Sequence, residues 1–184
     1  MNASYLIRRA TLRDIDELKT LIEKSAREVA NKSYTAVQLE TALRGAFGVD
    51  TQLINDGTYF VVACADGSIV GCGGWSRRLT LFGGDDRADR ETGELDRRTD
   101  GARIRAFFVH PGHVRRGIAS ALLERCETEA LADGFSKFEL IATLSGAPLY
   151  IARGYAVTGS VSYQAEPGVA IPFLAMTKHG LNRT

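Results

Sequence analysis

The sequence predicts a mixed α/β domain of the α+β class, in which helices pack against a central β-sheet. Apolar residues recur every three or four positions from Ile15 to Val29, which is typical of an amphipathic helix. Two β-prone runs flank an Asp-Gly turn at Asp66 and Gly67, which predicts a hairpin. Residues 103–142 follow the order strand, turn, helix and strand. Together these patterns predict a layered arrangement of a sheet and helices.

The chain has 184 residues, of which 45% are hydrophobic and 24% charged, and this suits one domain with its own core. We expect that domain to span residues 1–184. Residues 82–100 carry charges and glycines and very few apolar side chains, so they predict an exposed polar loop within the domain. Loops of that length are usually mobile or functional.

The first part of the chain should supply a strand, two helices and the hairpin. We expect the strand within residues 4–10, the first helix from about residue 15, and a second helix over residues 35–45. Thr35 suits the N-cap of the second helix, because its hydroxyl can accept a hydrogen bond from a first-turn N–H, and Gly45 suits the end. The hairpin strands should cover residues 59–65 and 68–75.

The second part of the chain predicts a βαβ unit. A strand over residues 103–109, a helix over 117–133 and a strand over 135–142 should place the two strands parallel. A short helix over residues 147–152 and two strands, over 155–160 and 170–178, should follow. Pro167 and Gly168 lie between the last two strands, where a turn is expected.

Composition indicates a soluble cytoplasmic protein. The formal net charge of +1 gives no overall attraction to a polyanion, so we expect no nucleic-acid partner. No segment approaches the roughly 20 apolar residues that span a bilayer, and we expect no membrane partner. The three cysteines lack the paired spacing of a zinc site or a disulfide framework, so we expect no metal and reduced thiols.

A basic turn before the central helix predicts an anion site. Arg115, Arg116 and Gly117 immediately precede the helical pattern, where free backbone N–H groups and the helix dipole attract negative charge. The alternative is a basic helix start after a loop. The three spaced glycines of a dinucleotide site and the Gly-Lys-Ser/Thr of a P-loop are both missing.

These residues resemble a motif of the GNAT superfamily of N-acetyltransferases. Its acyl-coenzyme A motif, Q/R-x-x-G-x-G/A at a helix start, aligns with residues 114–119, with Val114 where Gln or Arg is usual. Residues 107–111 resemble the central strand of the family, and residues 142–155 resemble its following strand, helix and Gly-Tyr strand. The resemblance implies a mixed, mostly antiparallel sheet of six to seven strands with a parallel, splayed central pair and about four helices.

The resemblance also implies acetyl-CoA as co-substrate, without a metal. Backbone groups of the central strand would pair with the pantetheine arm, as an added strand would. The turn and the first helical turn would hold the pyrophosphate, and Ser145 stands near where many relatives have a cofactor-contacting asparagine. The implied cofactor-binding residues are Phe107, Phe108, Val109, Val114, Arg115, Arg116, Gly117, Ile118, Ala119, Ser120 and Ser145.

For the chemistry, the resemblance implies two groups. Tyr150 would be the general acid that protonates the leaving thiolate, because a phenol keeps its proton at neutral pH. The backbone N–H of Val109 would contact the developing oxyanion. The general base stays open between a residue and water.

On the acceptor side we expect Tyr34, Trp75, Arg103 and Arg105, and the arginines suggest an acidic group on the substrate. The resulting hypothesis is direct transfer of acetyl from acetyl-CoA to a primary amine of a small molecule or a protein. The alternatives are an inactive acyl-CoA-binding or sensing module and, more remotely, a nucleotide-binding α/β protein. The protein would act as a monomer or a homodimer.

Overall fold

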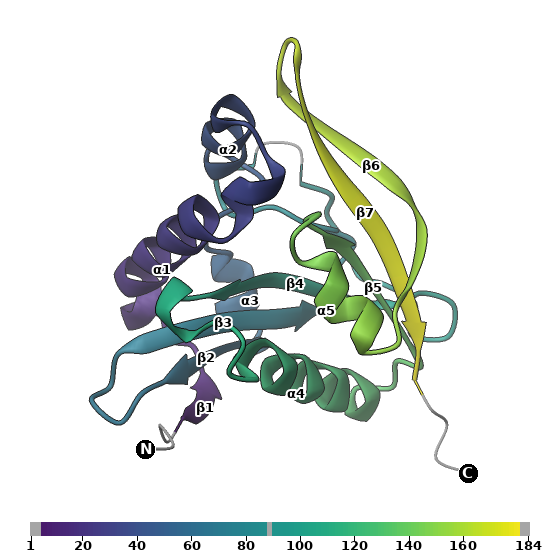
Figure 1. Ribbon diagram of the computed structural model, residues 1–184. Helices are drawn as coiled ribbons and strands as arrows, with labels where there is room; N and C mark the ends of the chain where they lie inside the picture. The colour runs from purple at the N-terminus through teal and green to yellow at the C-terminus, as the bar shows by residue number, and fades with distance from the viewer. Residues whose placement is uncertain (1–4, 88–89, 181–184) are drawn as a thin grey trace.

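The computed structural model describes residues 5–87 and 90–180, which form one seven-stranded sheet flanked by helices (Figure 1). The strand order is β1-β2-β3-β4-β5-β7-β6, and every neighbouring pair is antiparallel except β4 and β5. The strands are β1 Leu6–Arg9, β2 Tyr59–Ala63, β3 Ile69–Ser76, β4 Ala102–Val109, β5 Lys137–Ala142, β6 Ala156–Glu166 and β7 Val169–His179.

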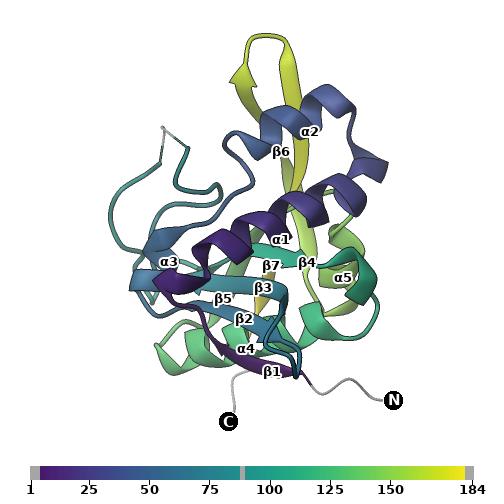
Figure 2. The ribbon, with the colours of Figure 1, turned by 90° about the vertical axis from the view of Figure 1, so that its left-hand side faces the viewer.

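Helices cover both faces of the sheet. The α-helices are α1 Ile15–Glu28, α2 Ala36–Leu43, α3 Thr51–Asn55, α4 Ile118–Ala132 and α5 Ala147–Ala152, and single 3-10 turns lie at Leu12–Asp14, Ala30–Ser33 and Pro111–His113. Apolar side chains of α1, α2 and α3 pack on one face of the sheet, and those of α4 and α5 pack on the other. Figure 2 shows α1 and α2 lying across the sheet on the side opposite α4. Two cores therefore enclose the sheet.

Local signals in the sequence explain where the helices begin. Thr35 accepts a hydrogen bond from the Gln38 backbone N–H, and the Gln38 side chain caps the Thr35 N–H in return. Asp50 caps α3 by accepting from the Gln52 N–H. α3 was not predicted from the sequence because five residues are too few to show an apolar period.

A bulge interrupts the central strand β4. Cys72 pairs with Phe108 and Gly74 pairs with Arg105, so two residues of β4 lie opposite the single Gly73. Ala106, inside the bulge, has a φ of 57°, which residues other than glycine rarely adopt. As a result, Arg105 and Ala106 both lie on the α1 face of the sheet, and Phe107 returns to the α4 face.

The parallel pair of strands separates soon after it begins. Pairing between β4 and β5 joins Ala102 to Phe138 and Arg103 to Glu139, and it goes no further along the described strands. This confirms the expected mixed sheet with a parallel, splayed central pair. The helix count is five rather than about four, and the last hairpin is longer than expected, since β6 and β7 have 11 residues each.

The polar segment between β3 and β4 lies against the body of the protein at several points. Arg78 and Glu94 form an isolated β-bridge, and Leu95 is buried in the core beside α4. Gly84 packs directly on Gly48, where an added Cβ would come within 2.8 Å of the Gly48 Cα. The segment therefore forms a wall beside the region between α2 and α3.

Candidate active site

A cavity of about 660 Å³ runs through the gap that opens between β4 and β5. Residues from both faces of the sheet line it. One end lies at the start of α4 and beside α5, and the other lies beneath α1, the segment after α2 and the wall formed by residues 81–83. We name these two ends the α4 end and the α1 end.

At the α4 end, the backbone before α4 forms a cradle of N–H groups. Arg115 has a φ of 62° and Gly117 a φ of 81°, and both values lie in the left-handed region. No side chain of the described residues caps α4 at Gly117. The N–H groups of Ile118, Ala119 and Ser120 have no partner within the helix by its geometry, and all three residues line the cavity.

The space beside Gly117 is open. A Cβ added at this glycine would meet no atom of the described residues within 4 Å, so their packing does not require the missing side chain there. Arg115 and Val114 also line the cavity, whereas Arg116 is not among the lining residues. An uncapped helix start with open space and a flanking arginine fits a phosphate or diphosphate group.

Between the two ends, β4 offers an edge without a strand partner. Phe107, Phe108 and Val109 line the cavity beyond the point where β5 departs. Their backbone groups on that side are free to pair with an extended ligand, as the edge of a sheet pairs with an added strand. The structure thus brings the predicted strand residues and the predicted turn into one cavity.

Tyr150 projects from α5 toward the same gap. It lines the cavity, and its ring meets that of Phe107 edge to face at 6.2 Å between centroids. Burial raises the pKa of the Tyr150 phenol above its ordinary value, because the phenolate would lose its hydration. Tyr150 therefore keeps its proton at neutral pH and can donate it.

At the α1 end, aromatic rings form most of the wall. Phe47, Phe82 and Phe173 line the cavity, and the centroid of the Phe173 ring lies 6.2 Å from that of Phe47 and 5.8 Å from that of Phe82. The guanidinium of Arg87 stacks 4.0 Å above the Phe82 ring and fixes its position. This end suits an apolar group.

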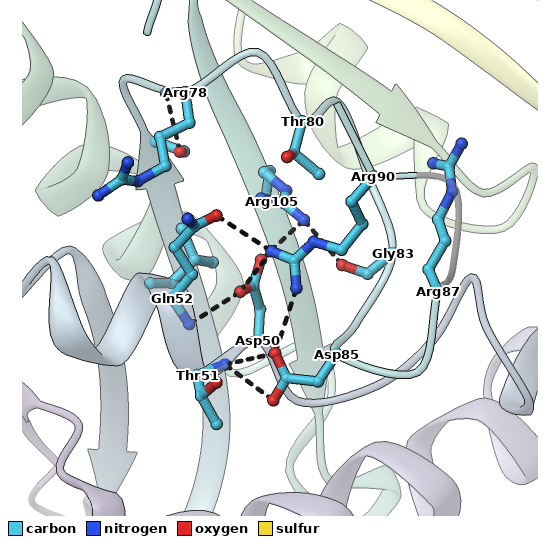
Figure 3. A network of polar contacts seen from close by, with 12 residues as sticks. Asp50, Thr51, Gln52, Arg78, Thr80, Gly83, Asp85, Arg87, Arg90 and Arg105 are labelled. Carbon is cyan, nitrogen blue, oxygen red and sulfur yellow. Dashed lines mark hydrogen bonds and ion pairs between the residues drawn. The ribbon is translucent and has the colours of Figure 1, made fainter. Parts of the chain in front are cut away.

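Arg105 is the charged side chain at the α1 end, and it belongs to a network of ion pairs (Figure 3). Its Nη2 donates to the Gly83 carbonyl at 2.7 Å and lies 2.8 Å from the Asp50 Oδ2. Arg90 donates to the Asp50 Oδ1 at 2.9 Å and also pairs with Asp85 at the surface. Burial lowers the pKa of Arg105, and the adjacent Asp50 opposes that shift.

Three other predicted residues lie elsewhere. Tyr34 donates to the Pro172 carbonyl and accepts from the Leu144 N–H, so it ties the segment after α1 to β7. Trp75 packs edge to face on Phe135 in the core beside α4. Arg103 pairs with Glu139 of β5. Residues 34, 75 and 103 are not among those that line the cavity.

Several lining residues were not predicted from the sequence. Ser25 of α1, Phe47, Phe82 and Gly83 reach the cavity only because distant segments meet above β4. Phe82 was partly visible in the sequence, because it is an aromatic residue at the start of the polar segment 82–100. Ser145 was predicted and does line the cavity, where its hydroxyl lies 3.4 Å from that of Thr143.

The charges around the cavity are of one sign. Arg105, Arg115 and Arg153 line it, and among the described residues no aspartate or glutamate does. Within residues 5–87 and 90–180, no group of three or more His, Cys, Asp or Glu side chains could hold a metal ion. No helix in the described part of the chain is long and apolar enough to cross a membrane.

Comparison with known proteins finds a family model and solved structures of similar fold. The family model described as the acetyltransferase (GNAT) family matches residues 16–155, which is more than half of the chain. A comparison with curated proteins finds no match.

Solved structures with the same fold include three N-acetyltransferases. A GCN5-related N-acetyltransferase from Rhodopseudomonas palustris has a TM-score of 0.69 at 18% identity, with 97% of this chain and 98% of that chain covered. The PaiA N-acetyltransferase from Thermoplasma acidophilum, solved with coenzyme A, has a TM-score of 0.63 at 15% identity, with 96% and 99% covered. A mosquito arylalkylamine N-acetyltransferase like 5b has a TM-score of 0.64 at 15% identity, with 96% and 100% covered.

Proposed function

Because the chain belongs to the acetyltransferase (GNAT) family, we propose that it transfers the acetyl group of acetyl-CoA to a primary amine. The observation that carries this proposal is the continuity of the cavity. It joins the uncapped start of α4 to the free edge of β4, to Tyr150 and then to the α1 end. One ligand can therefore enter from each end and meet the other in the gap between β4 and β5.

The residues at the α4 end fit the coenzyme. The N–H groups from Val114 to Ser120 and the guanidinium of Arg115 would bind the pyrophosphate, and the open space at Gly117 lets it approach the backbone. The free edge of β4 from Phe107 to Val109 would pair with the pantetheine arm, and Ser145 would add a contact from the opposite wall. When bound, acetyl-CoA supplies an activated acetyl thioester.

Two groups of the chain would assist the transfer. The backbone N–H of Val109 would donate to the thioester oxygen as negative charge develops there. Tyr150 would give its proton to the sulfur as the bond to the acetyl carbon breaks, because burial keeps the phenol protonated. Phe107 packs on the Tyr150 ring and holds the phenol beside the free edge of β4.

The acceptor amine must reach the gap without its extra proton. A simple amine of pKa about 10 is neutral only about one part in a thousand at pH 7. No carboxylate of the described residues lines the cavity to take that proton, and the positive lining itself disfavours an ammonium group. We propose that water removes the proton.

Thiol release and calorimetry together test this function. The purified protein is mixed with acetyl-CoA and a panel of primary amines, and free thiol is followed while acetyl-CoA binding is titrated separately. The proposal predicts acetyl-CoA binding and amine-dependent thiol release, with release slowed in Tyr150→Phe. Binding without release on any amine would instead indicate an acyl-CoA-binding module.

A further inference from the structure

The α1 end of the cavity combines aromatic walls with one buried cation. The walls come from Phe47, Phe82 and Phe173, and the cation is Arg105, whose side chain is 2% exposed. Asp50, its ion-pair partner, has a fully buried side chain. A buried guanidinium at the wall of a ligand cavity calls for a reason beyond packing, because burying a charge costs free energy unless it is fully paired.

Arg105 is only partly paired within the protein. Its Nη2 donates a hydrogen bond to the Gly83 carbonyl and forms an ion pair with the Asp50 Oδ2 at 2.8 Å. Its Nε and Nη1 are buried and have no hydrogen-bond partner among residues 5–87 and 90–180. The one N–H of Nε and the two of Nη1 thus make no hydrogen bond with the described residues.

Asp50 does not neutralise this region by itself. The single buried carboxylate contacts two guanidiniums, those of Arg105 and Arg90. The second carboxylate paired with Arg90 is that of Asp85, whose side chain is 40% exposed and therefore screened by water. In Figure 3 the Asp50 carboxylate lies beside the guanidiniums of Arg90 and Arg105, and a dashed line joins Arg105 to Gly83. The α1 end therefore keeps an attraction for an anion.

We propose that the acceptor carries a carboxylate beside its amine on an apolar body, as an apolar amino acid does, and that Arg105 binds the carboxylate. The unused N–H groups match a carboxylate in geometry and charge. The aromatic rings would cover the apolar body, and the amine would point toward the free edge of β4. This inference rests on the acetyl transfer proposed above and narrows its substrate class.

Polycationic acceptors fit this end poorly. Polyamines and aminoglycosides place several ammonium groups in the site and need carboxylates to hold them. The described lining has none, and it includes three arginines, Arg105, Arg115 and Arg153.

Matched pairs of acceptors test the proposal on the wild-type protein. We compare phenylalanine with 2-phenylethylamine and leucine with 3-methylbutylamine, with spermidine as a polycation, and measure kcat/KM by thiol release at fixed acetyl-CoA. The proposal predicts that each amino acid exceeds its decarboxylated partner by about 10-fold or more, the effect of one charge-assisted contact. Equal or faster acetylation of the partner amines or of spermidine would overturn it.

A substitution connects the preference to Arg105. Arg105→Gln should bring the two members of each pair to within about 3-fold of each other, while the KM for acetyl-CoA stays unchanged. Arg78→Gln is the matched control, since Arg78 is also paired with an aspartate, Asp56, and lies outside the cavity lining; the preference should persist in it. A preference that survives Arg105→Gln would contradict the proposed role of Arg105.

A binding measurement keeps the test decisive if Arg105→Gln does not fold or if turnover is absent. With coenzyme A present, N-acetylphenylalanine should raise the Tm of the wild-type protein more than N-acetyl-2-phenylethylamine does. Equal shifts would overturn the carboxylate site. Loss of acetyl-CoA binding, or absence of acetylation of every amine, would count against the proposed function instead, so the two failures are distinguishable.

Discussion

The hydroxyl of Tyr59 donates a hydrogen bond to the carbonyl oxygen of Ala106, at 3.3 Å, and so holds the bulge of β4 from beneath. The Cys72 Sγ lies 3.8 Å from the same oxygen. Both side chains are fully buried, and the φ of Ala106 is 57°. A backbone strained by about 1–3 kcal/mol persists only where its surroundings hold it. Tyr59 is thus a positioning residue for the free edge of β4.

Tyr59→Phe should weaken that support. We expect a loss of about 1 kcal/mol in the free energy of unfolding and a fall of roughly fivefold in kcat/KM for acetyl-CoA, because the edge that pairs with pantetheine shifts. Denaturant unfolding and thiol-release kinetics measure the two effects. Tyr155→Phe is the control: it removes the hydrogen bond to Glu127 on the α4 face and should lower stability alone. Unchanged kinetics in Tyr59→Phe would refute the positioning role.

Gly117→Ala should reduce the affinity for coenzyme A by more than the added backbone strain alone would. Gly117 has a φ of 81° and open space beside it, so an added methyl group would strain the turn and enter the proposed phosphate site. Gly168→Ala is a matched control with a φ of 79° and similarly open space, in the β6–β7 turn. We expect a rise of about 10-fold in the Kd for coenzyme A in the first variant only. If calorimetry finds the same Kd for coenzyme A in Gly117→Ala and in the wild type, the cradle is ruled out.

The pH dependence of acetyl transfer should follow the acceptor and not Tyr150. Burial raises the pKa of the Tyr150 phenol, so the acid keeps its proton as pH rises through the range in which amines lose theirs. The rate at subsaturating amine should therefore increase from pH 7 to about pH 9. A stopped assay across this range measures it. A fall in rate over that interval, present in wild type and absent in Tyr150→Phe, would show that the phenol ionises in it.

Asp14 should make stability depend on pH in the acid range. The hydrogen bonds from Arg8 lower the folded-state pKa of this carboxyl from 3.8 to about 2, and Thr11 adds to the shift. A depressed folded pKa means that the stabilisation is present above about pH 4 and is lost as pH falls toward 2. Because Arg8 is 38% exposed, we expect only about 1 kcal/mol. In urea unfolding, the difference in stability between wild type and Asp14→Asn should be smaller at pH 2.5 than at pH 5.

The sequence predicted the elements whose signals are local. The Thr35 cap, the Asp-Gly hairpin and the βαβ unit over residues 103–142 each depend on neighbouring residues, and the structure contains all three. The turn at Gly117 and the strand from Phe107 to Val109 were likewise visible as a short motif.

The α1 end could not be predicted in the same way. Phe47, Phe82 and Arg105 meet there because the wall after β3 folds back across the start of α3, and no short motif encodes that contact. The alternation of strand residues also misplaces side chains at β4, since the bulge at Ala106 puts Arg105 and Ala106 on the same face. Arg103, two residues earlier, pairs with Glu139 instead.

The most direct test of the central proposal is to follow the acetyl group itself. Acetyl-CoA with a deuterated acetyl group is incubated with the protein and phenylalanine or leucine, and the acceptor is analysed by mass spectrometry. We predict labelled acetyl on the acceptor nitrogen, formed at the rate of thiol release and at least about 10-fold more slowly in Tyr150→Phe. Binding of acetyl-CoA with no label on these or any other amines tested would contradict the proposal.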